Sequence, residues 1–133
     1  MDYDIPPEDA IHATKRAEYL DNEVVATMPR NGQGKKRVKV CFFPFHSYKI
    51  VNGVDTVPAK LGLKPDPYAV AQVNKDDPGF GDDHPNGTHW VDEEGRHCYA
   101  YFYHWDGKRR VRCGRLALDW NDNWWIGGVP VSS

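Results

Sequence analysis

The sequence predicts a single α+β domain, residues 1–133, in which an N-terminal helix packs on an antiparallel sheet that is either open or barrel-like. Three features support this fold class: an amphipathic pattern near the start, a proline-rich middle, and short aromatic runs separated by turn residues after residue 88. A chain of 133 residues with 40% hydrophobic residues has enough apolar surface for one core. We therefore expect one domain.

The first expected element is a helix over residues 7–22. Pro7 suits the first helical position, and the acidic residues Glu8 and Asp9 suit the positive end of a helix dipole. Apolar residues then recur at spacings of three and four: Ala10, Ala13, Ala17, Leu20 and Val24. This stripe consists mostly of alanine, so the helix is predicted to pack closely on the sheet.

The middle of the chain is predicted to be mostly irregular. Residues 30–36, RNGQGKK, place two glycines among polar side chains and are expected to form a mobile basic loop. Residues 53–87 contain five prolines and are expected to be loop-rich. Within them, Asp66 followed by Pro67 is typical of a helix start, which predicts a short helix over residues 68–74.

The last part, residues 88–129, is predicted to be a β-meander of about four strands, because turn clusters separate its short apolar runs. Its central hairpin is the stretch CYAYFYHWDGKRRVRC, residues 98–113. If Asp106 and Gly107 form a two-residue type I′ turn, Trp105 lies opposite Lys108, and Phe102 lies opposite Val111.

Strand alternation divides this hairpin into two faces. One face is small and apolar and is predicted to join the core: Cys98, Ala100, Phe102, Val111 and Cys113. The other face is aromatic and basic and is the predicted binding surface: Tyr99, Tyr101, Tyr103, Trp105, Lys108, Arg110 and Arg112. The basic loop is expected to add contacts through Lys35, Lys36 and Arg37.

This surface favours a non-enzymatic binding domain. Tyrosines on a sheet stack with unpaired bases, and neighbouring arginines contact phosphates, which suits single-stranded nucleic acid. Tyr, Trp and Arg are also the preferred anchors of protein interfaces, so a protein partner, an accessory or inhibitor role, or a homodimer through this face stays open. Cross-strand Tyr–Arg pairs could equally serve only to stabilise the sheet.

A metal-dependent hydrolase or nuclease is the alternative. The stretch GDDHPNGTH contains Asp83, His84 and His89, whose carboxylate and imidazole groups can hold a divalent metal. Their spacing matches no helical metal motif, so no metal or other cofactor is assigned and the non-enzymatic interpretation is favoured. The enzyme hypothesis requires these three side chains to converge in a pocket.

Charge and hydropathy bear on the partner and the compartment. The net charge is −2, but residues 107–118 hold five basic side chains and no acidic one, whereas residues 66–94 hold eight acidic side chains and one lysine. A local basic surface can attract an anionic partner despite the net charge. The chain shows neither a signal peptide nor a membrane-spanning run, so the sequence predicts a cytoplasmic protein with reduced cysteines and no membrane contact.

Overall fold

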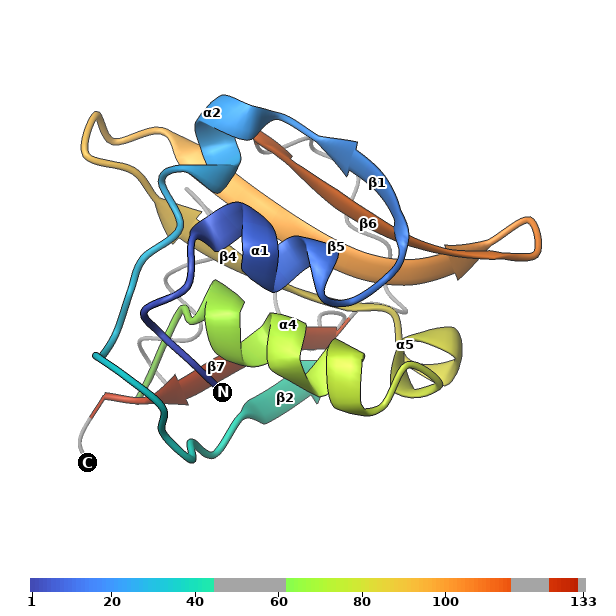
Figure 1. Cartoon of the computed structure of the whole chain (residues 1–133), viewed down its shortest axis with the longest axis horizontal. Coiled ribbons are helices and arrows are strands. Elements are labelled where there is room, and N and C mark those ends of the chain that lie inside the picture. Colours follow the sequence, from blue (N-terminus) through green and yellow to red (C-terminus); the bar gives the residue numbers. More distant parts are fainter. Residues whose placement is uncertain (45–61, 116–124, 132–133) are drawn as a thin grey trace.

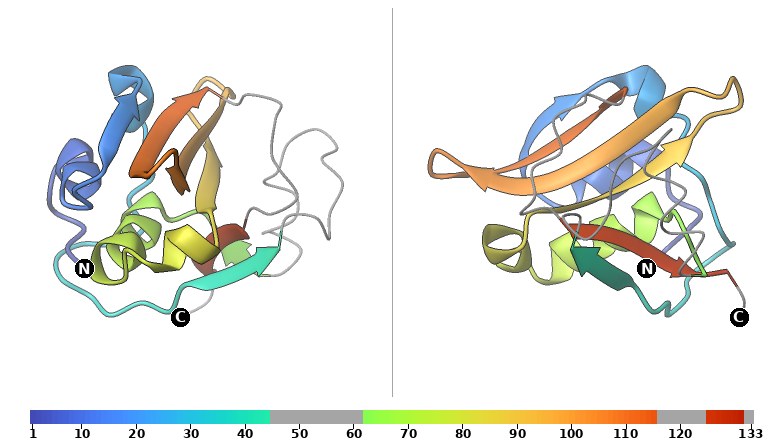
Figure 2. Two further views of the ribbon diagram at one scale, coloured as in Figure 1. Left: turned by 90° about the vertical axis from the view of Figure 1, so that its right-hand side faces the viewer. Right: turned by 180° about the vertical axis from the view of Figure 1, so that it is seen from behind.

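The computed structural model describes residues 1–44, 62–115 and 125–131. These residues form four helices and seven strands in a mixed sheet, so the α+β class is confirmed, and the sheet is not closed among the described strands. The helices lie on one side of the sheet (Figures 1 and 2). No helix of the described residues is long and apolar enough to span a membrane.

The sheet centres on three consecutive antiparallel strands: β4 (Asn86–Val91), β5 (His97–Trp105) and β6 (Lys108–Arg115). Strand β1 (Ala17–Leu20) pairs in parallel with β6 and forms one edge. Strand β7 (Trp125–Pro130) pairs in parallel with β4 and antiparallel with β2 (Cys41–Pro44) and β3 (Leu63–Lys64).

Two expectations about the sheet were therefore wrong. The sheet is mixed instead of antiparallel, and the last strand does not continue the meander over residues 88–129. Strand β7 lies beside β4 instead of β6, and it also pairs with β2. Both partners are remote from β7 in sequence, so local turn signals did not predict these pairings. Residues 116–124, which fall within the predicted meander, lie outside the described residues.

The predicted helix over residues 7–22 was also wrong in extent. Helix α1 (Pro7–His12) ends after six residues, the chain turns at Lys15 with a φ of 55°, and β1 follows. The side chain of Arg16 is buried beneath the sheet, where its guanidinium donates hydrogen bonds to the carbonyl oxygens of Tyr103 and Pro78. These long-range bonds provide partners for both terminal nitrogens of a buried guanidinium that a continuous helix would place elsewhere.

Helix α2 (Asn22–Val25) begins directly after β1, where the Asp21 carboxylate accepts a hydrogen bond from the Glu23 amide. Ala10 and Val24 of the predicted apolar stripe do reach the core, but from separate helices. The periodicity thus identified buried positions and not the element that buries them.

Helix α4 (Pro67–Asp76) confirms the helix expected after Asp66. The Asp66 side chain accepts the Ala69 amide at 2.9 Å, and the Tyr3 hydroxyl donates to the same buried carboxylate. The pKa of Asp66 is raised, because burial disfavours its charged form. Helix α5 (Phe80–Asp83) follows, so the part of residues 53–87 that the structure describes is more regular than predicted.

Residues 30–36 form no helix and no long strand, as expected of a loop, but hydrogen bonds tie them to the N-terminal segment. The Tyr3 amide donates to the Gly34 carbonyl, the Lys36 amide donates to the Met1 carbonyl, and the Gly34 amide donates to the Asp4 carboxylate, all at 2.9 Å. The basic segment is thus held against the first residues of the chain.

The main core lies between the helices and one face of β4–β5–β6. Ile11 of α1, Val24 of α2 and Val70 of α4 pack there against Phe102 and Val111, and all five side chains are fully buried. Cys98 and Cys113 lie in the same core as free thiols, as predicted. This core fixes which face of the hairpin is left for other contacts.

Candidate functional site

The β5–β6 hairpin has the predicted turn and register. Asp106 and Gly107 have φ values of 51° and 74°, as a type I′ turn requires. Trp105 pairs with Lys108, and Phe102 pairs with Val111. The apolar face of the hairpin lies in the main core, so the aromatic and basic side chains lie on the opposite face.

A binding role for this whole second face requires its side chains to be exposed, but the inner half of the face is buried. Tyr99 and Tyr101 are only 5% and 8% exposed, and their rings stack with centroids 4.2 Å apart. They form a second cluster with Phe43, Leu63 and Ile126, which β2, β3 and β7 bring to this face. The sequence did not indicate that these distant strands would pack against the same face.

The outer half of the face remains accessible. We define the aromatic-basic patch as six residues on β1, β5 and β6: Tyr19, Tyr103, Trp105, Lys108, Arg110 and Arg112. Trp105 is 67% exposed and Tyr19 is 45% exposed, and Arg112 is also exposed. The patch runs to the hairpin tip, which projects from the body of the sheet (Figure 1).

Tyr19 is the residue of this patch that sequence reasoning missed, because it lay within the predicted helix. Strand β1 aligns Tyr19 with Arg112, and the Arg110 guanidinium lies 5.5 Å from the centre of the Tyr19 ring. The Arg110 Nη1 also donates to the Tyr19 hydroxyl at 3.2 Å. The alternation of β1 covers only four residues, which is too short to distinguish a strand from a helix.

The cations on the two faces of β6 differ in their partners. Arg109, on the core face, holds the Asp82 carboxylate with Nη2 2.8 Å from Oδ2, and this hydrogen bond lowers the pKa of Asp82. Arg115, on the same face, lies 2.6 Å from the Asp92 carboxylate. On the patch, by contrast, no carboxylate of the described residues forms an ion pair with Lys108, Arg110 or Arg112. The patch therefore carries positive charge that no carboxylate of the described residues neutralises.

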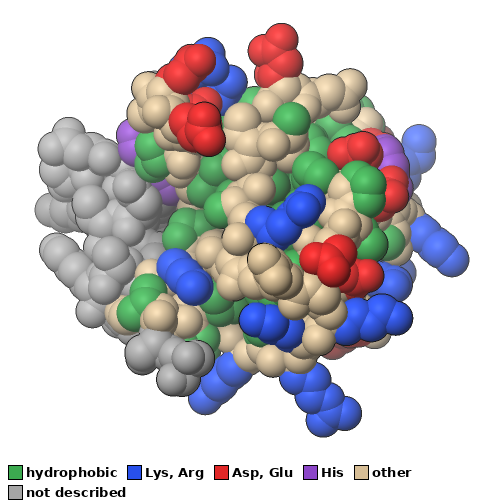
Figure 3. All heavy atoms as spheres, turned by 60° about the vertical axis from the view of Figure 1, so that its left-hand side comes forward, with side chains coloured by type: hydrophobic (Ala, Val, Ile, Leu, Met, Phe, Trp, Pro, Cys, Tyr) green, Lys and Arg blue, Asp and Glu red, His purple; other side chains and the backbone are tan. Residues whose placement is uncertain are grey.

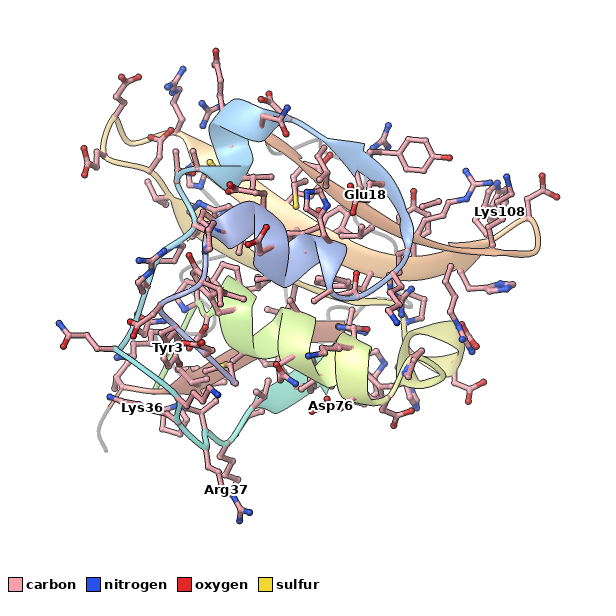
Figure 4. All side chains as sticks on the ribbon, in the orientation of Figure 1. Tyr3, Glu18, Lys36, Arg37, Asp76 and Lys108 are labelled. Atoms are coloured by element: carbon pink, nitrogen blue, oxygen red, sulfur yellow. The ribbon has the colours of Figure 1, made fainter. Side chains whose placement is uncertain are left out.

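The predicted basic loop does not extend this patch. Figure 4 places Lys36 and Arg37 at one end of the molecule and Lys108 at the other. Lys35 pairs with Asp2 through a backbone bridge in the same N-terminal region. The ten predicted binding residues therefore divide between two separate regions and the buried tyrosine cluster.

The described residues do not show the convergence that the metal-site hypothesis requires. The centroid of the His84 ring lies 5.4 Å from that of the Phe80 ring and 5.1 Å from that of the Trp125 ring, so His84 packs against aromatic side chains. His89 is buried and stacks on His97, with Nε2 3.1 Å from the His97 Nδ1. Within the described ranges, no three His, Cys, Asp or Glu side chains are grouped as metal ligands, so Asp83, His84 and His89 are not assigned as a site.

Comparison with protein-family models, with curated proteins and with solved structures found no match to this chain.

Proposed function

We propose that this protein is a non-enzymatic binding domain that engages single-stranded nucleic acid through the aromatic-basic patch. The observation that supports this most directly is the contrast across β6. Arg109 is neutralised by Asp82, whereas Arg110 lies against Tyr19 without a carboxylate partner among the described residues. Positive charge beside exposed rings suits a partner that has both phosphates and flat bases.

The expected division of roles follows from chemistry. Exposed rings such as Trp105 would stack on bases, at about 1–3 kcal/mol per base. Lys108, Arg110 and Arg112 would contact phosphates and release counterions, so affinity should fall as salt rises. This mode reads little sequence, because every base has a flat face on which to stack.

A titration of fluorescently labelled single strands of uridine and thymidine with the purified protein, at low and moderate salt, tests this proposal. We expect saturable binding at low salt that weakens strongly as salt increases. Arg112→Glu and Trp105→Ala should each weaken binding at least tenfold. Lys75→Glu, which makes the same charge change on an exposed residue of α4, should change affinity less than twofold.

The outcomes separate nucleic acid from a protein partner. If neither strand binds at low salt, or if Lys75→Glu is as harmful as Arg112→Glu, nucleic acid binding at this patch is wrong. An exposed Trp105 beside arginines would also suit a protein interface, including one with a second copy of the chain. A dimer seen by light scattering and lost in Trp105→Ala, without nucleic acid binding, would support that second function.

A further inference from the structure

A second basic region lies at the opposite end of the molecule from the patch. Residues 36–40 lead into β2 without forming a helix or a strand. A cavity of about 300 Å³ lies between this segment, β3 and the end of β7. Four cationic side chains line it: Lys36, Arg37, Lys39 and Lys64. Figure 3, which brings the left-hand side of Figure 1 forward, shows lysine and arginine side chains gathered along the lower part of that face.

These four cations lack ion-pair partners among the described residues. The Asp66 carboxylate, which lies close enough to Lys64 for an electrostatic interaction, is fully buried and already accepts hydrogen bonds from the Tyr3 hydroxyl and the Ala69 amide. Tyr3, whose hydroxyl donates to that carboxylate, lines the cavity and is itself buried. Like charges around one hollow repel each other, and a bound anion would remove that cost.

The cavity also has an apolar wall. Val38, Val129 and Pro130 line it, and Val38 is 37% exposed. A cavity that combines an apolar wall with a few convergent charged groups is typical of small-molecule sites, and about 300 Å³ is at the lower end of their usual range. An occupant should therefore be small, with one strongly anionic end and one apolar end.

We propose that this cavity binds a small organic phosphate monoester, with the phosphate among Lys36, Arg37, Lys39 and Lys64 and the apolar body against Val38, Val129 and Pro130. A phosphate monoester has nearly two negative charges at neutral pH and three acceptor oxygens. It therefore uses several cations at once, and the planar guanidinium of Arg37 can donate to two of its oxygens. The site is independent of the aromatic-basic patch.

The first test is an NMR titration of the ¹⁵N-labelled protein at constant ionic strength with phenyl phosphate, inorganic phosphate and phenol. Phenyl phosphate should cause saturable shifts in the amides of Val38, Lys39, Lys64 and Val129. Inorganic phosphate should bind at least tenfold more weakly, and phenol should not saturate. The proposal is wrong if phenyl phosphate causes no saturable shift here, or if it binds no more tightly than inorganic phosphate.

The second test compares two variants that each lose two exposed or half-exposed charges. Lys39→Gln with Lys64→Gln should weaken phenyl phosphate binding at least tenfold, whereas Lys15→Gln with Lys75→Gln should change it less than twofold. Retained amide spectra and melting temperatures show that both variants are folded. Equal losses in the two variants would mean non-specific charge attraction and would overturn the proposal.

Two further arms define the source of the phosphate and the independence of the site. Co-sedimentation with vesicles containing phosphatidic acid, in the presence and absence of phenyl phosphate, distinguishes a free phosphate from a lipid headgroup. Binding to the vesicles without any binding to free phenyl phosphate would overturn the small-molecule proposal. Arg112→Glu should leave phenyl phosphate binding unchanged, so this cavity and the nucleic acid patch can fail separately.

Discussion

Arg109 and Arg110 are neighbours in sequence, but they lie on opposite faces of β6 and are used differently. Arg109 points to the helical side, where Asp82 neutralises it, and the adjoining Val111 and Phe102 are fully buried. Arg110 points to the other side and lies against the Tyr19 ring. Strand alternation therefore separates a structural use of arginine from a cation left available for a partner.

The face of the hairpin that carries the patch is itself divided into a buried part and an exposed part. Near the middle of β5, Tyr99 and Tyr101 are buried with Ile126, whereas Trp105 near the tip is exposed. A strand can thus contribute to a core at one end and present a binding surface at the other. The three predictions below test this division, from the largest expected effect to the smallest.

The largest expected effect is that of truncating the core face. Phe102→Ala should lower the free energy of unfolding by about 3–5 kcal/mol, because it leaves a cavity in the main core. Trp105→Ala should lower it by less than about 0.5 kcal/mol, since its side chain is largely exposed. Guanidinium unfolding followed by far-ultraviolet circular dichroism measures both. A larger loss in Trp105→Ala than in Phe102→Ala would indicate that the register is shifted by one residue, which exchanges the faces.

An intermediate loss of stability is expected when a methyl group is added at Gly87, which lies against the buried Tyr101. A Cβ added at Gly87 would lie 2.4 Å from the Ala100 carbonyl oxygen and 2.7 Å from the Tyr101 Cδ1. Gly87→Ala should therefore cost about 1–3 kcal/mol through overpacking. Gly114→Ala is the matched control, because its Cβ would meet only the far end of the Tyr99 side chain, at 3.1 Å. Equal costs in chemical denaturation would contradict a close fit between Tyr101 and Gly87.

The smallest expected effect is a difference in pH dependence between the two arginines. Arg109 holds the pKa of Asp82 below its ordinary value of 3.8, so the ionised carboxylate is favoured in the folded state. The stability from this pair is present above pH 3.8 and is lost as the pH falls through the lowered pKa. The melting temperature of Arg109→Gln should lie below that of the wild type near neutral pH and approach it in acid.

Arg110→Gln provides the control for this pH profile. Arg110 has an aromatic partner, and no carboxylate among the described residues is paired with it. Its difference in melting temperature from the wild type should therefore stay constant over the same acidic range. If both differences shrink alike, Arg110 has an acidic partner and the proposed contrast between the faces fails.

Sequence reasoning was most successful where a few adjacent residues determine the conformation. Asp106 and Gly107 adopt the left-handed conformations of a type I′ turn, and this local choice sets the register of the whole hairpin. Asp66 before Pro67 likewise predicted the start of α4, because the capping bond spans only three residues.

Reasoning from periodicity failed where distant contacts decide between alternatives. The spacing from Ala10 to Val24 is compatible with one long helix, but the carbonyl groups of Tyr103 and Pro78 hold Arg16 in a different path. That change converts Tyr19 from a helical residue into part of the patch on β1. The predicted binding surface therefore lacked Tyr19, because β1 has only four residues and is too short to be recognised as a strand from its sequence.

The sequence by itself determined that this protein has an α+β fold and a hairpin with one apolar and one aromatic, basic face, because turn chemistry and side-chain alternation act over a few neighbouring residues. Only the tertiary structure decided which part of the second face is exposed. Ile126, Phe43 and Leu63 reach Tyr99 and Tyr101 from remote strands, and Tyr19 joins Arg110 across a parallel pair. Such long-range packing depends on the whole chain, so alternation defined both faces of the hairpin but not the exposed surface.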